Sequence, residues 1–516
     1  MKLNHTRLRG TVCAAVLALA MLGGSHDALA GKDNNSIAVS IQTDIVTFDP
    51  ANGTHGSDIP ILYTMYDRLF DFNPEDMTLR PMLATEWSWS DDQKTLVIKL
   101  REGVKFHDGS ELNADAVKAS LDYFMASGTN LDLSQVAEVN VTGPYEVSVT
   151  SKVVNSSLPG LLAERAGMIL SPKNIELHGK DGYGQHPVGT GPYKLKNHTV
   201  GTSIVVERFD DYWNPADQHL DEIEFRIIKN ATSAVSAVMT GQLDYVATVD
   251  PVNIPALERN PNVRISIEPM LGFGIFHVNP GLAPLDDKRV RQAFSLAIDR
   301  QVLAKAVYGV VETKSNVLPV PQGYWPSTDS IQQNYKYDPE KAKALLAEAG
   351  HPNGVTVPVC VNANENMPQP ALKVMDIITP QLAAGGITLD VKQVANTAAC
   401  VDLFVNQKVV PAFLVGWSGR PDPAITYDQM LASTSYYNAS KTVHGNADEL
   451  LAELKSTFDQ EAQKAIYDKL NEVYVDSLPM ISLYSYINPV VYAKGLVGER
   501  PNLLGRPYVR VLRWEN

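Results

Sequence analysis

Residues 355–415 alternate between two hydrophobic patterns, and this alternation limits the possible folds more than any other feature of the chain. Short apolar, β-branched runs are separated by stretches of helical periodicity, in the order strand, helix, strand, helix, strand. This order is typical of an α/β unit, because parallel strands need a long crossover that is usually a helix. We therefore predict a parallel sheet with covering helices in this region.

Local signals predict further elements on both sides of this unit. Asp338-Pro339-Glu340 combines an N-cap, a proline at the first helical position and an acid in the first turn, and Gly350 marks the end of that helix. Two more helices are predicted from about Asp287 and over 460–476. Within residues 95–100, the apolar residues at 96, 98 and 100 recur at every second position, which indicates a half-buried strand.

The first 30 residues have the layout of a secretory signal peptide. Basic residues precede a short apolar run, and Ala28-Leu29-Ala30 supplies small residues before a cleavage point after Ala30. The apolar run is about half the length of a membrane span of ~20 residues, which argues against an uncleaved anchor. Cys13 lies inside this run, so a lipoprotein anchor is not expected. We predict export to the bacterial periplasm.

Composition excludes some classes of protein. The chain has 516 residues and a net charge of −14, whereas a general nucleic-acid binder needs a basic surface. Attachment to anionic membranes by charge is disfavoured for the same reason. With 44% hydrophobic residues, the chain can bury several cores, so we expect multiple lobes.

No catalytic or metal-binding pattern stands out in the sequence. Gly416-Trp417-Ser418-Gly419-Arg420 has an arginine at the position where the G-x-S-x-G pattern of a nucleophile elbow requires a glycine. The histidines lack the spacing of a zinc site. We therefore expect neither an enzyme nor a bound cofactor or metal. An exported hydrolase stays as an alternative that would need a catalytic group not visible in the sequence.

Two features of the predicted α/β unit leave alternatives open. Cys360 and Cys400 can form a disulfide in an oxidising compartment or remain two buried thiols. The loop 416–423 follows a predicted strand, at the sheet edge where ligands commonly bind. Trp417 and Arg420 could contact a ligand there, or the loop could be a structural turn in which Arg420 pairs with Asp422.

The chain resembles the large periplasmic solute-binding proteins of ABC importers, the oligopeptide, dipeptide and nickel-binding family. The resemblance runs from about residue 37 to 485, and the loop 416–423 is the last of the stretches that carry it. The other stretches that carry it are Tyr66-Asp67-Arg68-Leu69-Phe70, Leu83-Ala84-Thr85-Glu86-Trp87, Phe106-His107-Asp108-Gly109, Ala114-Asp115-Ala116-Val117, Gly189-Thr190-Gly191-Pro192-Tyr193, Arg289-Val290-Arg291-Gln292-Ala293-Phe294 and Tyr337-Asp338-Pro339-Glu340-Lys341-Ala342. Each stretch is weak alone, but their order and spacing are specific.

The resemblance implies an α/β, periplasmic-binding-protein-like fold with two lobes and an extra inserted domain, which close over a ligand by a hinge motion. Lobe I would comprise residues 31–72, 186–276 and 486–516. Lobe II would be the insert 73–185, and lobe III residues 277–485. The partners implied are membrane permeases and cytoplasmic ATPases, and the protein is expected to be a monomer.

The resemblance also indicates which residues bind the ligand. Peptide-binding relatives carry an aspartate for the ligand amine where this chain has Arg420, so an anionic ligand group is expected there. Asp422 could still bind an amine if the loop is shifted by two residues. The stretch after Cys360 lacks the arginine that peptide binders can place there. The candidate ligand-binding residues are Thr47, Phe48, Asp49, Phe273, Asn362, Asn364, Trp417, Ser418, Arg420, Asp422 and Tyr486.

These expectations favour a peptide as the imported solute. Glutathione, or another anionic amide or opine, is the alternative ligand, because the reversed charge at Arg420 would suit such a molecule. A binding module that serves a sensor or chaperone is a third possibility. For Phe48 and Phe273, a role in the hydrophobic core is at least as well supported as ligand contact.

Overall fold

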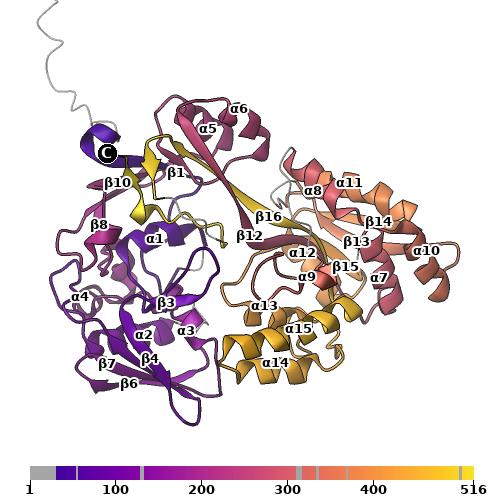
Figure 1. The fold of residues 1–516 in the computed structure, drawn as a ribbon, viewed down its shortest axis with the longest axis horizontal. Helices are drawn as coiled ribbons and strands as arrows, with labels where there is room; N and C mark the ends of the chain where they lie inside the picture. Colours follow the sequence, from indigo (N-terminus) through magenta and orange to yellow (C-terminus); the bar gives the residue numbers. More distant parts are fainter. Residues whose placement is uncertain are drawn as a thin grey trace, which may run out of the picture.

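The computed structural model describes residues 31–53, 56–127, 133–309, 317–332, 336–365, 367, 370–498 and 503–515. The predicted signal peptide, residues 1–30, lies outside the described residues. Figure 1 shows two groups of elements, one around β1, β8 and β10 and the other around β13, β14 and β15, with β12 and β16 between them. None of the helices in the described ranges has the length and hydropathy that crossing a membrane requires.

One mixed sheet of ten strands runs through both groups, in the order β14-β13-β15-β12-β16-β11-β1-β10-β9-β8. Its strands are β1 (Ser36–Ile41), β8 (Tyr193–Thr199), β9 (Ser203–Arg208), β10 (Glu222–Ile227), β11 (Tyr245–Val246), β12 (Val263–Val278), β13 (Val355–Asn362), β14 (Ile387–Val394), β15 (Ala412–Trp417) and β16 (Met480–Ala493). The α/β class predicted from the sequence and the family resemblance is confirmed.

Strands β12 and β16 are the physical link between the two groups. They pair antiparallel from Val263↔Ala493 to His277↔Met480, with a register shift between Pro269 and Phe273. The predicted lobe boundaries at 276 and 486 fall inside these two strands. A bend in a pair of crossing strands is a suitable place for a hinge motion.

The second group contains the predicted α/β unit. Strand β13 pairs in parallel with both β14 and β15, and α11 (Ala371–Ala384) and α12 (Thr397–Val401) form the two crossovers. The predicted helices are α7 (Lys288–Leu296), α10 (Pro339–Glu348) and α15 (Gln460–Ser477). Aspartates 287, 338 and 459 cap them by accepting a hydrogen bond from a first-turn backbone N–H.

Cys360, near the end of β13, forms a disulfide with Cys400 in α12. Both residues are fully buried, in a small apolar cluster that includes Phe404 and Phe413. The bond closes a loop across 40 residues and so ties the second crossover to the first strand of the unit. This is one of the two states that the sequence left open.

The insert forms its own antiparallel sheet, in the order β4-β5-β7-β6. Its elements are β4 (Ala84–Trp89), β5 (Thr95–Leu100), β6 (Val136–Gly143), β7 (Glu146–Ser151) and the covering helix α2 (Ala114–Ser127). Residues 96, 98 and 100 of β5 are buried, which confirms the predicted alternation. The short helices α3 (Leu158–Leu161) and α4 (Pro172–Gly182) follow this sheet, and the hairpin of β2 (Phe70–Phe72) and β3 (Leu79–Pro81) precedes it at the boundary of the insert.

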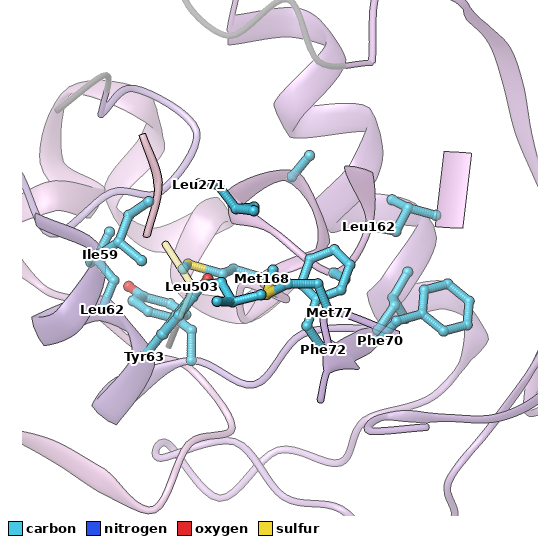
Figure 2. Packing of buried hydrophobic residues seen from close by; sticks show 14 of the residues in the cluster. Ile59, Leu62, Tyr63, Phe70, Phe72, Met77, Leu162, Met168, Leu271 and Leu503 are labelled. Atoms are coloured by element: carbon cyan, nitrogen blue, oxygen red, sulfur yellow. The ribbon is translucent and has the colours of Figure 1, made fainter. Parts of the chain in front are cut away.

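Segments far apart in sequence share one apolar cluster (Figure 2). Leu271 of β12 and Leu503 near the C-terminus pack with residues of α1 (Ile59–Met65) and with the hairpin residues Phe72 and Met77. The Leu271 N–H also donates a 2.7 Å hydrogen bond to the Leu503 carbonyl. Burial of this surface fixes the C-terminal segment, residues 503–511, against the first group and the crossing strand.

Candidate ligand-binding cleft

A cavity of about 870 Å³ lies where the first group meets the crossing strands. Its walls come from residues 39–44 at the end of β1, residues 503–507 of the C-terminal segment, Tyr486 of β16 and the loop after β15. Ala231 and Ala234 of α5 (Ala231–Met239) complete one side. The volume is within the range of about 300–1,000 Å³ typical of small-molecule sites.

The wall from the first group carries a carboxylate, Asp44. Strand β1 lies in the sheet parallel to β10, and Asp44 is in the loop that leaves its carboxyl end, a common position for ligand contacts. Asp44 Oδ1 lies 2.9 Å from His198 Nε2, and Oδ2 accepts a 2.7 Å hydrogen bond from the Gly201 N–H. Partial burial opposes ionisation, but the hydrogen bonds from Gly201 and His198 lower the pKa of Asp44. The cavity wall therefore carries a negative charge at neutral pH.

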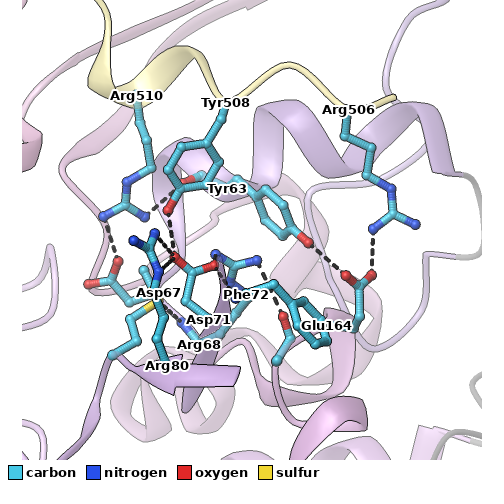
Figure 3. A network of polar contacts seen from close by, with 12 residues as sticks. Tyr63, Asp67, Arg68, Asp71, Phe72, Arg80, Glu164, Arg506, Tyr508 and Arg510 are labelled. Carbon is cyan, nitrogen blue, oxygen red and sulfur yellow. Dashed lines mark hydrogen bonds and ion pairs between the residues drawn. The ribbon is translucent and has the colours of Figure 1, made fainter. Parts of the chain in front are cut away.

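The C-terminal segment supplies the opposite charge, Arg506 (Figure 3). Its guanidinium pairs with Glu164 of the insert, and the other oxygen of Glu164 accepts a 3.1 Å hydrogen bond from the Tyr63 hydroxyl. Burial alone would lower the pKa of Arg506, but the Glu164 carboxylate raises it. Arg506 therefore stays charged, and the insert takes part in building the cleft.

A buried ion pair anchors the segment that carries Arg506. Arg510 lies 2.8 Å from Asp67 with both side chains at most 1% exposed, and it also donates to the Tyr63 carbonyl. The Tyr508 hydroxyl donates a 3.2 Å hydrogen bond to Asp71. Figure 3 shows these contacts on the same stretch of backbone as Arg506. The position of Arg506 is thus set by several contacts that do not involve the cavity.

The wall from the second group is aromatic and closely packed. The Tyr486 ring lies over two glycines: a Cβ on Gly272 would be 2.7 Å from Tyr486 Cδ2, and one on Gly416 would be 2.5 Å from its hydroxyl. Within the described part of the chain, the buried Tyr486 hydroxyl and Trp417 Nε1 have no hydrogen-bond partner. Buried polar groups are normally paired, so these two stand out beside the cavity.

The structure brings only some of the predicted residues to this cavity. Ser418 and Tyr486 line it. Thr47, Phe48 and Asp49 instead line a neighbouring cavity of about 580 Å³, and Val46 lines both cavities. Asp49 is buried and accepts hydrogen bonds from the Ala51 N–H, the Asn52 amide and the Tyr123 hydroxyl. These contacts give Asp49 a role in holding its own loop.

Four other predicted residues contact protein groups beside the cleft. Phe273 and Trp417 are opposite each other in the β12–β15 pairing and are both buried. Asn362 donates to Glu365 and Thr397, and Asn364 donates to the Ala395 carbonyl. Among the described residues, these four are outside the lining of the cavity.

Arg420 and Asp422 take part in the structure of their own loop. Arg420 donates a 3.3 Å hydrogen bond to the Ser418 carbonyl, and its Cζ lies 5.8 Å from the Trp417 ring centre. Asp422 caps α13 (Pro423–Leu431) by accepting a 2.8 Å hydrogen bond from the Ala424 N–H. Burial raises the pKa of Asp422 in spite of hydrogen bonds from Ser157 and that N–H. Neither side chain is among the described residues that line the cavity.

Asp44 and Arg506, the charged residues that line the cavity in the described part of the chain, were not predicted from the sequence. Each is a single residue outside any recognisable motif. The position of Asp44 after the first strand is the only signal that could have indicated it. Nothing in the sequence near Arg506 indicates that residues from the end of the chain return to the cleft.

Comparison with known proteins identifies the family. The model of the bacterial extracellular solute-binding proteins, family 5 Middle, matches residues 78–438. The glutathione-binding protein GsiB of Shigella dysenteriae serotype 1 (strain Sd197) is 30% identical over 488 residues, which cover 91% of this chain and 92% of that protein.

Two solved structures share the fold. HbpA2 from Haemophilus parasuis has a TM-score of 0.84 and 23% identity, covering 93% of this chain and 100% of that chain. The ABC transporter-associated periplasmic binding protein DppA from Helicobacter pylori, in complex with the peptide STSA, has a TM-score of 0.75 and 22% identity, covering 93% and 98%.

The family consists of solute-binding proteins that work with ABC importers, and its members are not enzymes. The family match covers most of the chain, and the relative from Shigella dysenteriae covers nearly all of it. The resemblance stated from the sequence motifs is therefore confirmed. The chain is the solute-binding component of an ABC importer and belongs to family 5 of the bacterial extracellular solute-binding proteins.

Proposed function

We propose that this protein captures a short peptide in the periplasm, with glutathione as the first ligand to test, and delivers it to the permeases of an ABC importer. The observation that carries the proposal is the cavity of about 870 Å³, whose wall holds a carboxylate, Asp44, and a guanidinium, Arg506. A peptide with free ends carries charges of both signs. The similarity to the glutathione-binding protein GsiB over nearly the whole chain supports the same class of ligand.

The uncharged parts of the wall suit a peptide backbone. Gly272 and Gly419 line the cavity, and their missing side chains let Tyr486 and Leu271 pack directly against the backbone of the wall. Ser40, Thr43 and Ser418 add hydroxyl groups that can donate or accept hydrogen bonds. Recognition through main-chain groups favours binding of peptides with different side chains.

Contacts between the insert and the second group support a closing motion. The Ser156 N–H donates a 3.1 Å hydrogen bond to the Lys455 carbonyl, and the rings of Trp89 and Phe458 lie 4.9 Å apart. These contacts bridge the two sides of the molecule, and β12 and β16 provide the connection about which the sides can rotate. We propose that the mature protein begins after Ala30, acts as a monomer in the periplasm, and closes on one ligand.

A thermal-shift screen of the mature protein tests this function. The probes are reduced and oxidised glutathione, di- to pentapeptides and opines. At a concentration 100 times its Kd, a ligand that binds only the folded state stabilises the protein by about 2.7 kcal/mol. We expect at least one peptide or glutathione to raise the melting temperature. If only opines do so, or if no compound in the panel does, the peptide proposal is wrong.

A further inference from the structure

Among the described residues, the charged side chains that line the cavity are Asp44 and Arg506, and they differ in how many polar contacts the protein already makes to them. Both carboxylate oxygens of Asp44 have protein partners, His198 and the Gly201 N–H. Arg506 has five N–H donors, and among the described residues its polar partners are Glu164 and Tyr63. The guanidinium therefore has more unused hydrogen-bonding capacity toward a ligand than the carboxylate does.

Glu164 fixes the orientation of this guanidinium. It pairs with Arg506 through Oε2 while Oε1 accepts from the Tyr63 hydroxyl, so the carboxylate is held at both oxygens. Figure 3 shows Glu164 between the Tyr63 hydroxyl and the end of Arg506. Its side chain is 13% exposed and that of Arg506 is 21% exposed, so the pair is partly screened from solvent, and Arg506 is the member that lines the cavity.

A second guanidinium lies near the first. Arg165 follows Glu164 in sequence and is buried, and burial together with repulsion from Arg506 lowers its pKa. An anionic ligand group next to Arg506 would reduce this repulsion. A cationic group at the same place would increase it.

We propose that Arg506 is the subsite for a carboxylate of the ligand and that Glu164, from the insert, is the positioning residue that orients it. The chemistry favours a carboxylate because a guanidinium can donate two parallel hydrogen bonds to it. This inference rests on the proposed function, because it assumes that a peptide-class ligand occupies the cavity. It gives the insert a role in selecting the ligand, and it moves the anion-binding role from Arg420 to Arg506.

The test compares two arginines and three forms of one ligand. Arg506→Gln removes the proposed subsite, and Arg420→Gln is the matched control, because it makes the same change outside the cavity lining. The probes are glutathione and two derivatives, each with one of its two carboxylates converted to an amide. Calorimetry gives the Kd for each combination of protein variant and ligand.

We expect one of the two amides to bind wild type and Arg420→Gln about 10- to 100-fold more weakly than glutathione, as for loss of a charge-assisted hydrogen bond. In Arg506→Gln, glutathione and that amide should bind with nearly equal affinity. We call the factor by which amidation weakens binding the amide penalty. The same amide penalty in wild type and Arg506→Gln would overturn the proposal. A simple structural defect would weaken all three ligands alike, so it would leave the penalty unchanged.

Two further variants keep the proposal falsifiable if Arg506→Gln does not fold. Arg506→Lys keeps the charge but loses the planar pair of donors, so the amide penalty should shrink without vanishing. Glu164→Gln removes the orienting charge, and the penalty should fall while the affinity for the amide changes little. An unchanged penalty in both variants would overturn the proposal. If wild type binds neither glutathione nor any peptide, the proposed function itself fails, which is a distinguishable result.

Discussion

The two faces of the cleft are built in different ways. The face from the first group presents charges, Asp44 and Arg506, which come from segments more than 450 residues apart. Each is held by a partly exposed polar partner, His198 for Asp44 and Glu164 for Arg506. The face from the second group consists of Tyr486 and the loop 416–423, in which Arg420 and Asp422 bond to their own loop or to the helix that follows it. The first face uses protein contacts to present charge to a ligand, whereas the second uses its charges to maintain its own shape.

The largest expected effect is on the ion pair behind the charged face. Asp67→Asn leaves the Arg510 charge buried without its partner, which should reduce the free energy of unfolding by about 3–5 kcal/mol. The matched control is Asp428→Asn, which breaks a partly exposed pair with Lys455 and should cost at most about 1 kcal/mol. Urea denaturation measures both. Equal losses would show that the buried pair does not anchor the C-terminal segment.

The next effect concerns the packing of the loop 416–423 against β12. A Cβ on Gly419 would lie 2.2 Å from Leu271 Cβ and 2.7 Å from its backbone carbonyl carbon, so Gly419→Ala should destabilise the protein by about 1–3 kcal/mol. The control Gly160→Ala has its nearest neighbour at 3.8 Å and should change stability by less than about 0.5 kcal/mol. If thermal melts show no difference between the two variants, the loop is not tightly packed on β12.

A smaller effect is expected at the helix cap. Asp422→Ala removes the N-cap of α13 and should cost about 1 kcal/mol of stability, comparable to Asp459→Ala at the start of α15. Ligand affinity should stay unchanged in both variants. A selective loss of affinity for ligands with a free amine in Asp422→Ala would show that Asp422 binds the ligand amine, as one interpretation of the sequence allowed.

The smallest effect is expected at Arg420. Arg420→Gln removes a hydrogen bond to the Ser418 carbonyl at the protein surface, so the stability should change by less than about 0.5 kcal/mol. Chemical denaturation of this variant beside Arg506→Gln measures the contrast between the two arginines. If Arg420→Gln lowered the free energy of unfolding as much as Arg506→Gln does, the distinction between the two faces would be lost.

Much of the fold could be predicted because its signals are local. The alternation over 355–415 and the capped helices at Asp287, Asp338 and Asp459 depend on periodicity and on neighbouring residues, and the structure has these elements. The same reasoning could have assigned Asp422 to a cap, because Asp422-Pro423 repeats the pattern of Asp338-Pro339. Short acidic side chains at turns commonly bond to nearby backbone N–H groups, which also accounts for Asp49.

The charged face could not be predicted, because it depends on tertiary contacts. Arg506 reaches the cavity only because Leu503 packs on Leu271, and because Arg510 pairs with Asp67 across more than 440 residues. Neither contact has a signature within a window of the sequence. The family motifs indicated the loop of the second group, and they carried no information about the end of the chain.

The most direct test is a crystal structure of the mature protein with the strongest ligand found in the thermal-shift screen. The account predicts one ligand per chain, in the cavity between residues 39–44 and 503–507, with a ligand carboxylate at hydrogen-bond distance from Arg506. A ligand bound in the neighbouring cavity beside Thr47 and Asp49, or with its carboxylate on Arg420, would contradict the account.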